Sequence, residues 1–324
     1  MDFRFVSPSG LREADAFELD DMLLNEEGFV WIDIADFSDA DRRFLFDRFG
    51  FHPVALDITA ARNHMPMVHG YADHVFAVLH RPVVIDVGHV HLYEIDMFLG
   101  GRYLVTVHPS TEPSKGTVSE IDETIDRIKG GRIHPATPAQ LAHAVISLVA
   151  LRQRLLVQRV AERVNEIEMR VLDRSMSDPE SSLDEMFMLR YELLSVRTAA
   201  AHSEEIMARA RRLPSISTPD ERDVVDDLED MFRRVHRMTD HEQEFLAGVI
   251  ELYRARTDTK MMIATERLAV LAAVTLPITA IASVYGMNVI VNPKTEPIQL
   301  TVVILFMLAI SLYLLRWTKR LGWW

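Results

Sequence analysis

The sequence contains no cysteine among its 324 residues. Disulfide bonds, thiolate metal sites and cysteine nucleophiles are therefore excluded. Several catalytic signatures are also absent: no G-x-x-x-x-G-K-[ST] phosphate loop, H-E-x-x-H zinc motif, G-x-S-x-G nucleophile elbow or G-x-G-x-x-G dinucleotide fingerprint occurs. ATP-driven work is thus unsupported, and we expect a protein that is not an enzyme and uses no organic cofactor.

Charged side chains are missing from two long stretches near the end of the sequence. Residues 268–285 read LAVLAAVTLPITAIASVY, and with the next three residues, Gly286, Met287 and Asn288, they make about 21 residues, or roughly 31 Å of helix. Residues 298–315, IQLTVVILFMLAISLYLL, form a second uncharged run of 18. Because a bilayer core is about 30 Å thick, both runs are long enough to cross it. Two buried core helices are the alternative, which such long uncharged runs after a charged chain disfavour.

Basic residues flank the two runs on one side of the predicted membrane. They are Arg254, Arg256, Lys260 and Arg267 before the first run, and Arg316, Lys319 and Arg320 after the second. The connecting loop holds one lysine, Lys294, and one acid, Glu296. The positive-inside rule then places both termini in the cytoplasm. We expect a two-span protein of the inner cell membrane, with residues 1 to about 262 in the cytosol.

The formal net charge is −13, from 48 acidic and 35 basic residues. A nucleic-acid-binding protein usually carries a basic patch, so we expect no nucleic-acid partner. The acidic surface is compatible with a protein that meets cations. It is equally compatible with a large cytosolic part that is kept soluble by its charge.

A stripe of small or weakly polar residues runs along one face of the first span. Ala272, Leu276, Thr279 and Ser283 recur at spacings of four, three and four, which puts them on one side of a helix. Two helices cannot enclose a pore alone, so an ion pathway would need several copies around an axis. The stripe could line such a pathway, or it could be a small-residue packing seam between membrane helices.

The first part of the chain has the pattern of an α/β domain. Strand-like runs lie at 29–35, 74–85, 89–99 and 102–108, and 39–49 has helical spacing. From Thr137 the pattern becomes helical, with helices predicted from there to about 174, at 183–212, and from Pro219 to Asn288 without a clear break. The last would be roughly 105 Å long. The fold class is thus α+β, with a cytosolic α/β domain (1–136), a helical stalk (137–262) and a transmembrane hairpin (263–324).

The sequence Tyr285-Gly286-Met287-Asn288, at the outer end of the first of two final spans, resembles the signature of the CorA family of magnesium transporters. The stretch 276–279, LPIT, is similar to the family's MPxT. The resemblance covers the whole chain. It implies a homopentameric funnel in a lipid membrane, with a pore lined by the first span and a selectivity filter at Gly286, Met287 and Asn288.

An amide ring suits the ion that this family carries. Mg²⁺ is small and gives up its water shell reluctantly. Neutral amide oxygens of Asn288 could hydrogen-bond to the ion's waters without removing them, whereas carboxylates would compete for direct coordination. Conduction also requires binding that is weak enough to release the ion. The alternative is that Asn288 merely caps the helix.

The ungapped match to the family extends the stripe toward the cytosol. The implied pore-lining residues are Ser283, Thr279, Leu276, Ala272, Leu268, Thr265 and Met262. Leu276 stands where methionine is frequent, and Thr265 stands where the inner constriction often has a large apolar residue. Leu268 and Met262 would then form that gate. The outer loop also lacks the acidic MPEL-like stretch of the family.

The resemblance further implies that Mg²⁺ bound between cytosolic subunits holds the pore shut. The match places one regulatory metal ligand at Asp227 and a second acid, Glu251, near the inner mouth. Both could instead be ordinary solvated acids of the stalk. A partner from the α/β domain is not identified by the match, and Asp73 and Asp96 are the candidates we consider.

Three functions remain open from the sequence. The first is a passive Mg²⁺ channel in which Mg²⁺ is both transported and regulatory. The second keeps the fold but carries Zn²⁺ or Co²⁺/Ni²⁺; the family's zinc-carrying relatives usually vary the Gly-Met-Asn tripeptide, so its intact form favours Mg²⁺. The third is a membrane-anchored enzyme or scaffold, which no catalytic motif in the sequence supports.

Overall fold

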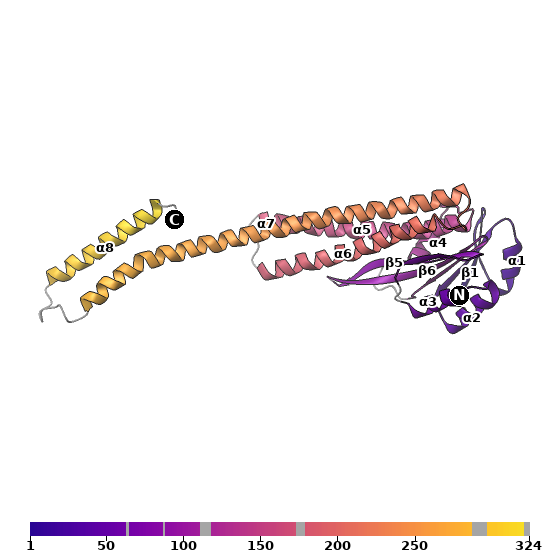
Figure 1. Ribbon diagram of the computed structural model, residues 1–324, viewed down its shortest axis with the longest axis horizontal. Coiled ribbons are helices and arrows are strands. Elements are labelled where there is room, and N and C mark those ends of the chain that lie inside the picture. The colour runs from indigo at the N-terminus through magenta and orange to yellow at the C-terminus, as the bar shows by residue number, and fades with distance from the viewer. Residues whose placement is uncertain (63–64, 87, 111–117, 173–178, 287–296, 321–324) are drawn as a thin grey trace. The chain divides into compact units, whose positions relative to one another are not determined.

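The computed structural model describes all residues of the chain except 63–64, 87, 111–117, 173–178, 287–296 and 321–324. Its contacts divide the chain into two compact units, Met1–Val249 and Ile250–Trp324. Figure 1 shows the helices and strands of both units. The predicted division into three parts at 136 and 262 stays a prediction.

A mixed seven-stranded sheet forms the centre of the first unit, in the order β2-β1-β3-β7-β6-β5-β4. Its strands are β1 (Asp2–Ser7), β2 (Gly10–Ala14), β3 (Phe29–Ala35), β4 (Met67–Gly70), β5 (His74–Asp86), β6 (His89–Gly100) and β7 (Tyr103–His108). β3 and β7 pair in parallel, and the other neighbouring strands pair antiparallel. The four predicted strands are confirmed as β3, β5, β6 and β7.

Helices cover both faces of this sheet. Near the N-terminus are a 3₁₀ turn (Ala16–Glu18), α1 (Leu19–Leu24), α2 (Asp39–Phe49) and α3 (Pro53–Ala61); later come α4 (Glu120–Lys129), α5 (Pro138–Leu172), α6 (Pro179–Ala210) and α7 (Pro219–Gly286). Side chains alternate between the two faces of a strand, so each face builds its own core. Trp31 of β3 and Phe232 of α7 belong to the core on one face, and Phe98 stacks on Phe51, with ring centroids 4.4 Å apart, on the other.

The helices α5 and α7 begin where the sequence predicts, whereas α6 begins at Pro179, four residues before the predicted start at 183. The amide of Gln140 donates to Thr137 Oγ1 over 3.2 Å at the start of α5. At the start of α7 the amide of Glu221 donates to Thr218 Oγ1 over 3.2 Å, and Glu221 Oε2 accepts from the Thr218 amide over 3.0 Å. This reciprocal capping box satisfies amides that the first turn leaves free.

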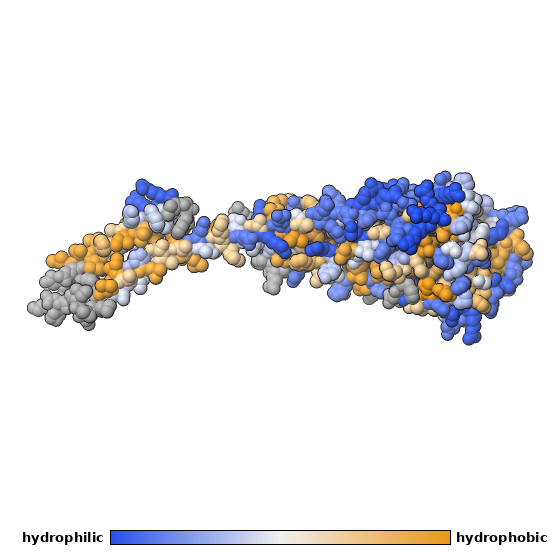
Figure 2. All heavy atoms as spheres, in the orientation of Figure 1, coloured by the Kyte–Doolittle hydropathy of each residue, from blue (hydrophilic) through white to orange (hydrophobic). Residues whose placement is uncertain are grey.

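The predicted unbroken final helix is confirmed as α7, which has 68 residues and keeps Pro277 in its interior. It begins in the first unit and ends in the second, where α8 (Pro297–Arg320) follows. These two helices are long and apolar enough to cross a membrane, with mean hydropathies of 1.9 and 2.1 over their most apolar 18-residue windows. Only 6% and 0% of those windows are buried, and Figure 2 shows the hydrophobic surface that results on the second unit.

Candidate ion pathway and metal-sensing residues

The predicted pore-lining residues share one face of α7, and we call this set the pore stripe. It consists of Met262, Thr265, Leu268, Ala272, Leu276, Thr279 and Ser283, and every member is exposed in the single chain. Leu268 and Leu276 are 66% and 67% exposed. By contrast, Val270 is buried, and Val274 and Pro277 are half-buried on another face. The pore stripe is therefore not the face that α7 uses for packing within the second unit.

Two threonines of the pore stripe bond to their own helix. Thr279 Oγ1 donates to the Thr275 carbonyl over 2.8 Å, and Thr265 Oγ1 donates to the Met261 carbonyl over 2.9 Å. A hydroxyl carries one hydrogen and two lone pairs. Because the hydrogen is used by the helix, what each threonine can offer to a passing group is an acceptor oxygen. Waters around a hydrated cation present their hydrogens outward, so such oxygens can receive them.

The described part of α7 ends at Gly286, which is exposed. Met287 and Asn288, the other two residues of the predicted filter, lie outside the described residues. The structure therefore brings the pore stripe up to the predicted filter. The filter's own geometry stays a prediction.

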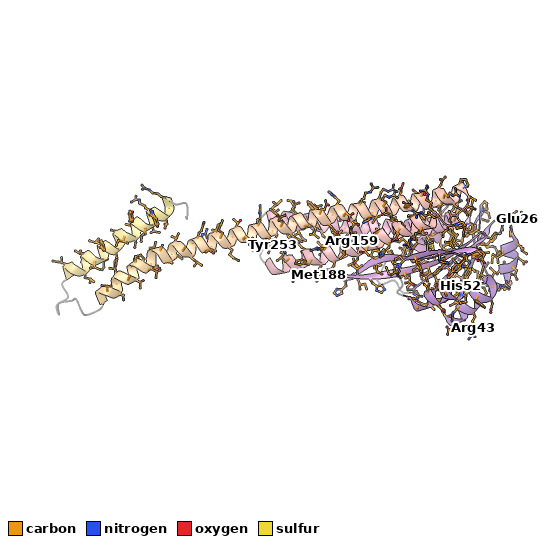
Figure 3. The ribbon with its side chains drawn as sticks, viewed as in Figure 1. Glu26, Arg43, His52, Arg159, Met188 and Tyr253 are labelled. Carbon is orange, nitrogen blue, oxygen red and sulfur yellow. The ribbon has the colours of Figure 1, made fainter. Side chains whose placement is uncertain are left out.

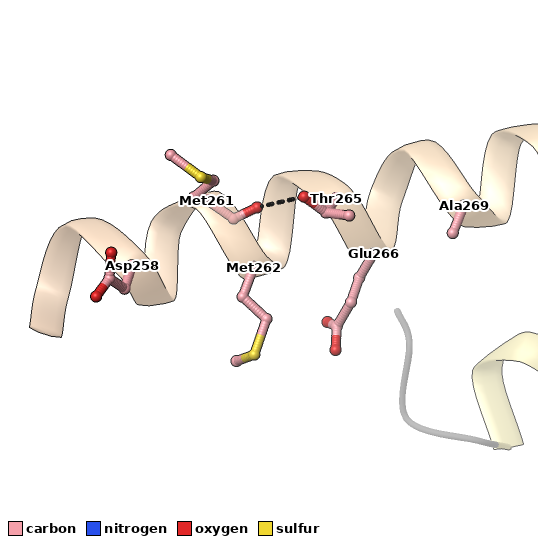
Figure 4. Close-up of a pocket in the computed structure, with 6 residues that line it drawn as sticks. All are labelled: Asp258, Met261, Met262, Thr265, Glu266 and Ala269. Atoms are coloured by element: carbon pink, nitrogen blue, oxygen red, sulfur yellow. Dashed lines mark hydrogen bonds between the residues drawn. The ribbon is translucent and has the colours of Figure 1, made fainter.

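A cavity of about 500 Å³ opens beside α7 at the Met262 end of the pore stripe. It is lined by Asp258, Met261, Met262, Thr265, Glu266 and Ala269. Figure 4 shows Met262 and Glu266 on the same side of the helix. The predicted gate residue Met262 thus lies among acids, Asp258 and Glu266, that sequence reasoning did not select. Glu251, the predicted acid of the inner mouth, is exposed on the same helix.

Asp227, the predicted regulatory ligand, lies on α7 within the first unit. Its Oδ2 atom is 2.8 Å from Nε2 of His143 on α5, and its side chain is 49% exposed. The neighbouring Asp226 is instead paired with Arg211, at 3.0 Å. One carboxylate and one imidazole do not complete a Mg²⁺ site, which normally takes six oxygens. Within the described part of the chain, no group of three or more His, Asp or Glu side chains is arranged to hold a metal ion.

The two candidate partners from the α/β domain differ sharply. Asp73 is exposed and bonds to His74 Nδ1 at 2.7 Å. Asp96 is only 2% exposed, and burial together with the charge of Glu94 raises its pKa to about 8. A buried carboxyl that holds its proton at neutral pH is poorly suited to meet a cation from another subunit. Asp73 is the better of the two candidates.

A polar network between α6 and α7 was missed by the sequence reasoning. His236 lies 3.1 Å from Glu204 and 3.7 Å from Asp240, and these acids pair with Arg233 at 3.0 Å and Arg197 at 2.5 Å. The spacing of His236 and Asp240, four residues apart, was the available signal. Because both acids already have arginine partners, the network joins α6 to α7 rather than offering a free metal site.

Together these features define a class of protein. Its members have a folded part of α/β and helical structure and two long apolar helices, one of which exposes a weakly polar stripe. The family model described as CorA-like Mg²⁺ transporter protein matches residues 26–320. The chain belongs to this family, whose members are ion transporters and channels rather than enzymes.

A curated relative and several solved structures are similar to the chain. "Putative metal ion transporter YfjQ" of Bacillus subtilis strain 168 is 23% identical over 298 residues, covering 91% of this chain and 90% of that protein. The complete structure of the CorA magnesium transporter from Methanocaldococcus jannaschii superposes with a TM-score of 0.82 at 17% identity, covering 100% and 99% of the two chains. The full-length CmaX protein gives 0.77 at 14% identity, covering 98% and 97%.

The cytoplasmic domain of ZntB from Vibrio parahaemolyticus gives a TM-score of 0.60 at 12% identity, covering 80% of this chain and 98% of that one. At these identities the structures establish the shared fold. They confirm a soluble α/β part, a long helix and a final helix that could span a membrane. The chain therefore has the fold of a divalent-cation transporter, and its ion is a separate question.

Proposed function

We propose that this protein is a passive Mg²⁺ channel of the inner membrane. The observation that carries the proposal is the pore stripe, an exposed and uncharged row along α7 that leads to Gly286. Several copies, five by the family resemblance, would surround one axis with these rows facing inward. Asn288 would form the selectivity ring at the outer mouth, with both termini of each chain in the cytoplasm.

The chemistry of the row suits a hydrated ion. Thr265 and Thr279 offer acceptor oxygens, and the residues of the pore stripe that lie between them, Leu268, Ala272 and Leu276, bear no charge. A pathway without carboxylates gives the cation no strong ligand, so the ion keeps its waters and leaves again. Concentration difference and membrane potential supply the driving force.

Regulation is proposed to use the exposed carboxylate of Asp227, with Glu251 near the inner mouth. Mg²⁺ would recruit the remaining ligands from waters and from a neighbouring copy, since the described residues of one chain supply no complete site. The bound ion would favour the closed arrangement of the stalks, and its loss would release them.

The alternative is a Zn²⁺ or Co²⁺/Ni²⁺ transporter on the same fold. His143 favours it, because an imidazole beside Asp227 is a donor that these ions accept more readily than Mg²⁺ does. The similarity to the ZntB domain concerns the fold alone and does not decide between the ions.

The deciding experiment measures ion uptake into proteoliposomes with a Mg²⁺-sensitive dye and, separately, a Zn²⁺-sensitive dye. Asn288→Ala is compared with Asn292→Ala, a matched substitution in the same loop. Mg²⁺ entry that is lost in Asn288→Ala alone supports the proposal. Entry of Zn²⁺ without Mg²⁺ would establish the alternative, and no entry of either ion would refute both.

A further inference from the structure

A positively charged cavity lies between three helices of the first unit, and none of its lining residues belongs to the pore stripe. Its volume is about 320 Å³. Its lining includes Arg127 of α4, Arg154 of α5 and Arg234 of α7, together with Leu148 and Met231 and other apolar residues of α5 and α7. Three arginine side chains around one cavity are unexpected in a chain with a net charge of −13.

Two of the three arginines are free to take a ligand. Arg127 is paired with Glu123, at 2.6 Å. Among the described residues, Arg154 and Arg234 have no ion-pair partner, and both are exposed. A guanidinium presents a planar fork of N–H donors that matches the oxygens of a phosphate group. Two such forks on neighbouring helices can hold a chain of phosphates.

The floor of the cavity is apolar. Leu148 and Val235 are 1% and 2% exposed, and Met231 packs on the core of the unit. Small-molecule sites usually combine such a floor with a few placed polar groups, in cavities of about 300–1,000 Å³. The lining on each long helix spans eight residues, from Ser147 to Arg154 and from Met231 to Met238, or roughly 12 Å. That is small for a stable protein contact, which buries about 800 Å² per partner.

We propose that this cavity binds a nucleoside polyphosphate, with the phosphates on Arg154 and Arg234 and the base over the apolar floor. The site goes beyond the proposed ion channel and does not depend on it. No phosphate loop is needed for binding without hydrolysis, so the missing G-x-x-x-x-G-K-[ST] motif is no obstacle. Because α7 also carries the pore stripe, a ligand on Arg234 would contact the helix that carries the proposed ion pathway.

Equilibrium binding of radiolabelled ATP to the full-length protein in detergent tests the proposal. Arg154→Gln/Arg234→Gln is expected to weaken ATP binding at least tenfold. The matched control is Arg159→Gln/Arg237→Gln, which removes two exposed arginines from the same helices outside the cavity; Figure 3 labels Arg159. This control should bind ATP as the natural protein does. Unlabelled ATP should compete better than tripolyphosphate, and tripolyphosphate better than adenosine.

Several results would overturn the proposal. The first is no ATP binding by the natural protein, and the second is an equal loss of ATP binding in the test and control variants. The third is displacement of the label by a short-chain phosphatidylglycerol but not by unlabelled ATP, which would identify the arginines as a lipid site. A change of oligomer size in Arg154→Gln/Arg234→Gln, by light scattering, with unchanged ATP binding would make the cavity a contact between subunits. Unchanged melting temperatures verify that the variants fold. Since binding is read without ion flux, failure of the channel proposal would leave this result intact.

Discussion

His143 on α5 contacts Asp227 on α7, with Nε2 of the histidine 2.8 Å from Oδ2 of the aspartate. The contact joins residues 84 positions apart in the sequence. It places the one carboxylate that the family resemblance selects as a metal sensor beside a second possible donor. It also leaves that carboxylate half-exposed, so a cation arriving from solvent or from a neighbouring subunit can reach it.

Asp227→Asn is expected to reduce sensing of Mg²⁺. Loss of one charged contact costs about 1.5–3 kcal/mol, so the Mg²⁺ concentration that protects the full-length protein from proteolysis should rise about tenfold or more. The matched control is Asp223→Asn, an exposed acid one helical turn earlier. If the protecting concentration stays the same in Asp227→Asn, or rises equally in the control, Asp227 is an ordinary solvated acid.

A large side chain in the pore stripe is expected to block conduction. Ala272 is exposed on that face, and Ala272→Phe would place an apolar ring where several copies converge. Hydrophobic constrictions stop ions by excluding their water, so uptake into proteoliposomes should fall about tenfold or more. Ala282→Phe makes the same change on an exposed site off the stripe and should conduct normally. Equal flux through both variants would identify the stripe as a packing seam.

The sequence was informative where a local pattern decides the structure. The runs of β3, β5, β6 and β7 are rich in β-branched and aromatic residues, and the alternation that buries Trp31 and Phe98 on opposite faces follows from strand geometry. The pore stripe likewise follows from the helical period. β1 and β2 were missed because they are short and mix charged with apolar residues; β1 is fixed by its pairing with β3, and β2 by its pairing with β1.

Contacts between distant elements could not be read in this way. The contact of His143 with Asp227, and the cavity that Arg154 and Arg234 both line, depend on the offset of α5 and α7 along their axes. That offset is set by packing in the core, which no local pattern encodes. The burial of Asp96 could not be predicted from the sequence for the same reason, since an isolated aspartate in a strand has the pattern of an exposed residue.

Breaking the buried ion pair between Arg81 and Glu120 is expected to destabilise the first unit. The Arg81 Nε and Glu120 Oε1 atoms are 2.7 Å apart, with side chains only 3% and 1% exposed. Replacing the carboxylate by a neutral amide removes the charge that faces the buried Arg81, and breaking a buried ion pair typically costs about 3–5 kcal/mol. Glu120→Gln should therefore lower the melting temperature of the full-length protein by several degrees.

Glu13→Gln is the matched control for this pair. Glu13 pairs with Lys129 at 3.1 Å, but both side chains are more than half exposed. Exposed pairs contribute about 0–1 kcal/mol, so this variant should melt close to the natural protein. Equal melting of the two variants would show that water reaches the Arg81–Glu120 pair.

Asp96 should make the stability of the protein depend on pH. Burial, aided by the nearby charge of Glu94, raises its pKa from 3.8 to about 8. The folded state then holds the proton more tightly than the unfolded chain does, so stability is greatest below the unfolded pKa and falls as pH rises through about 8.

Asp96→Asn keeps a neutral group of similar shape and removes this loss of stability. We expect its melting temperature, relative to the natural protein, to rise steadily between pH 5 and pH 8 and then level off. A difference for Asp96→Asn that is constant with pH would mean that Asp96 is ionised in the folded protein.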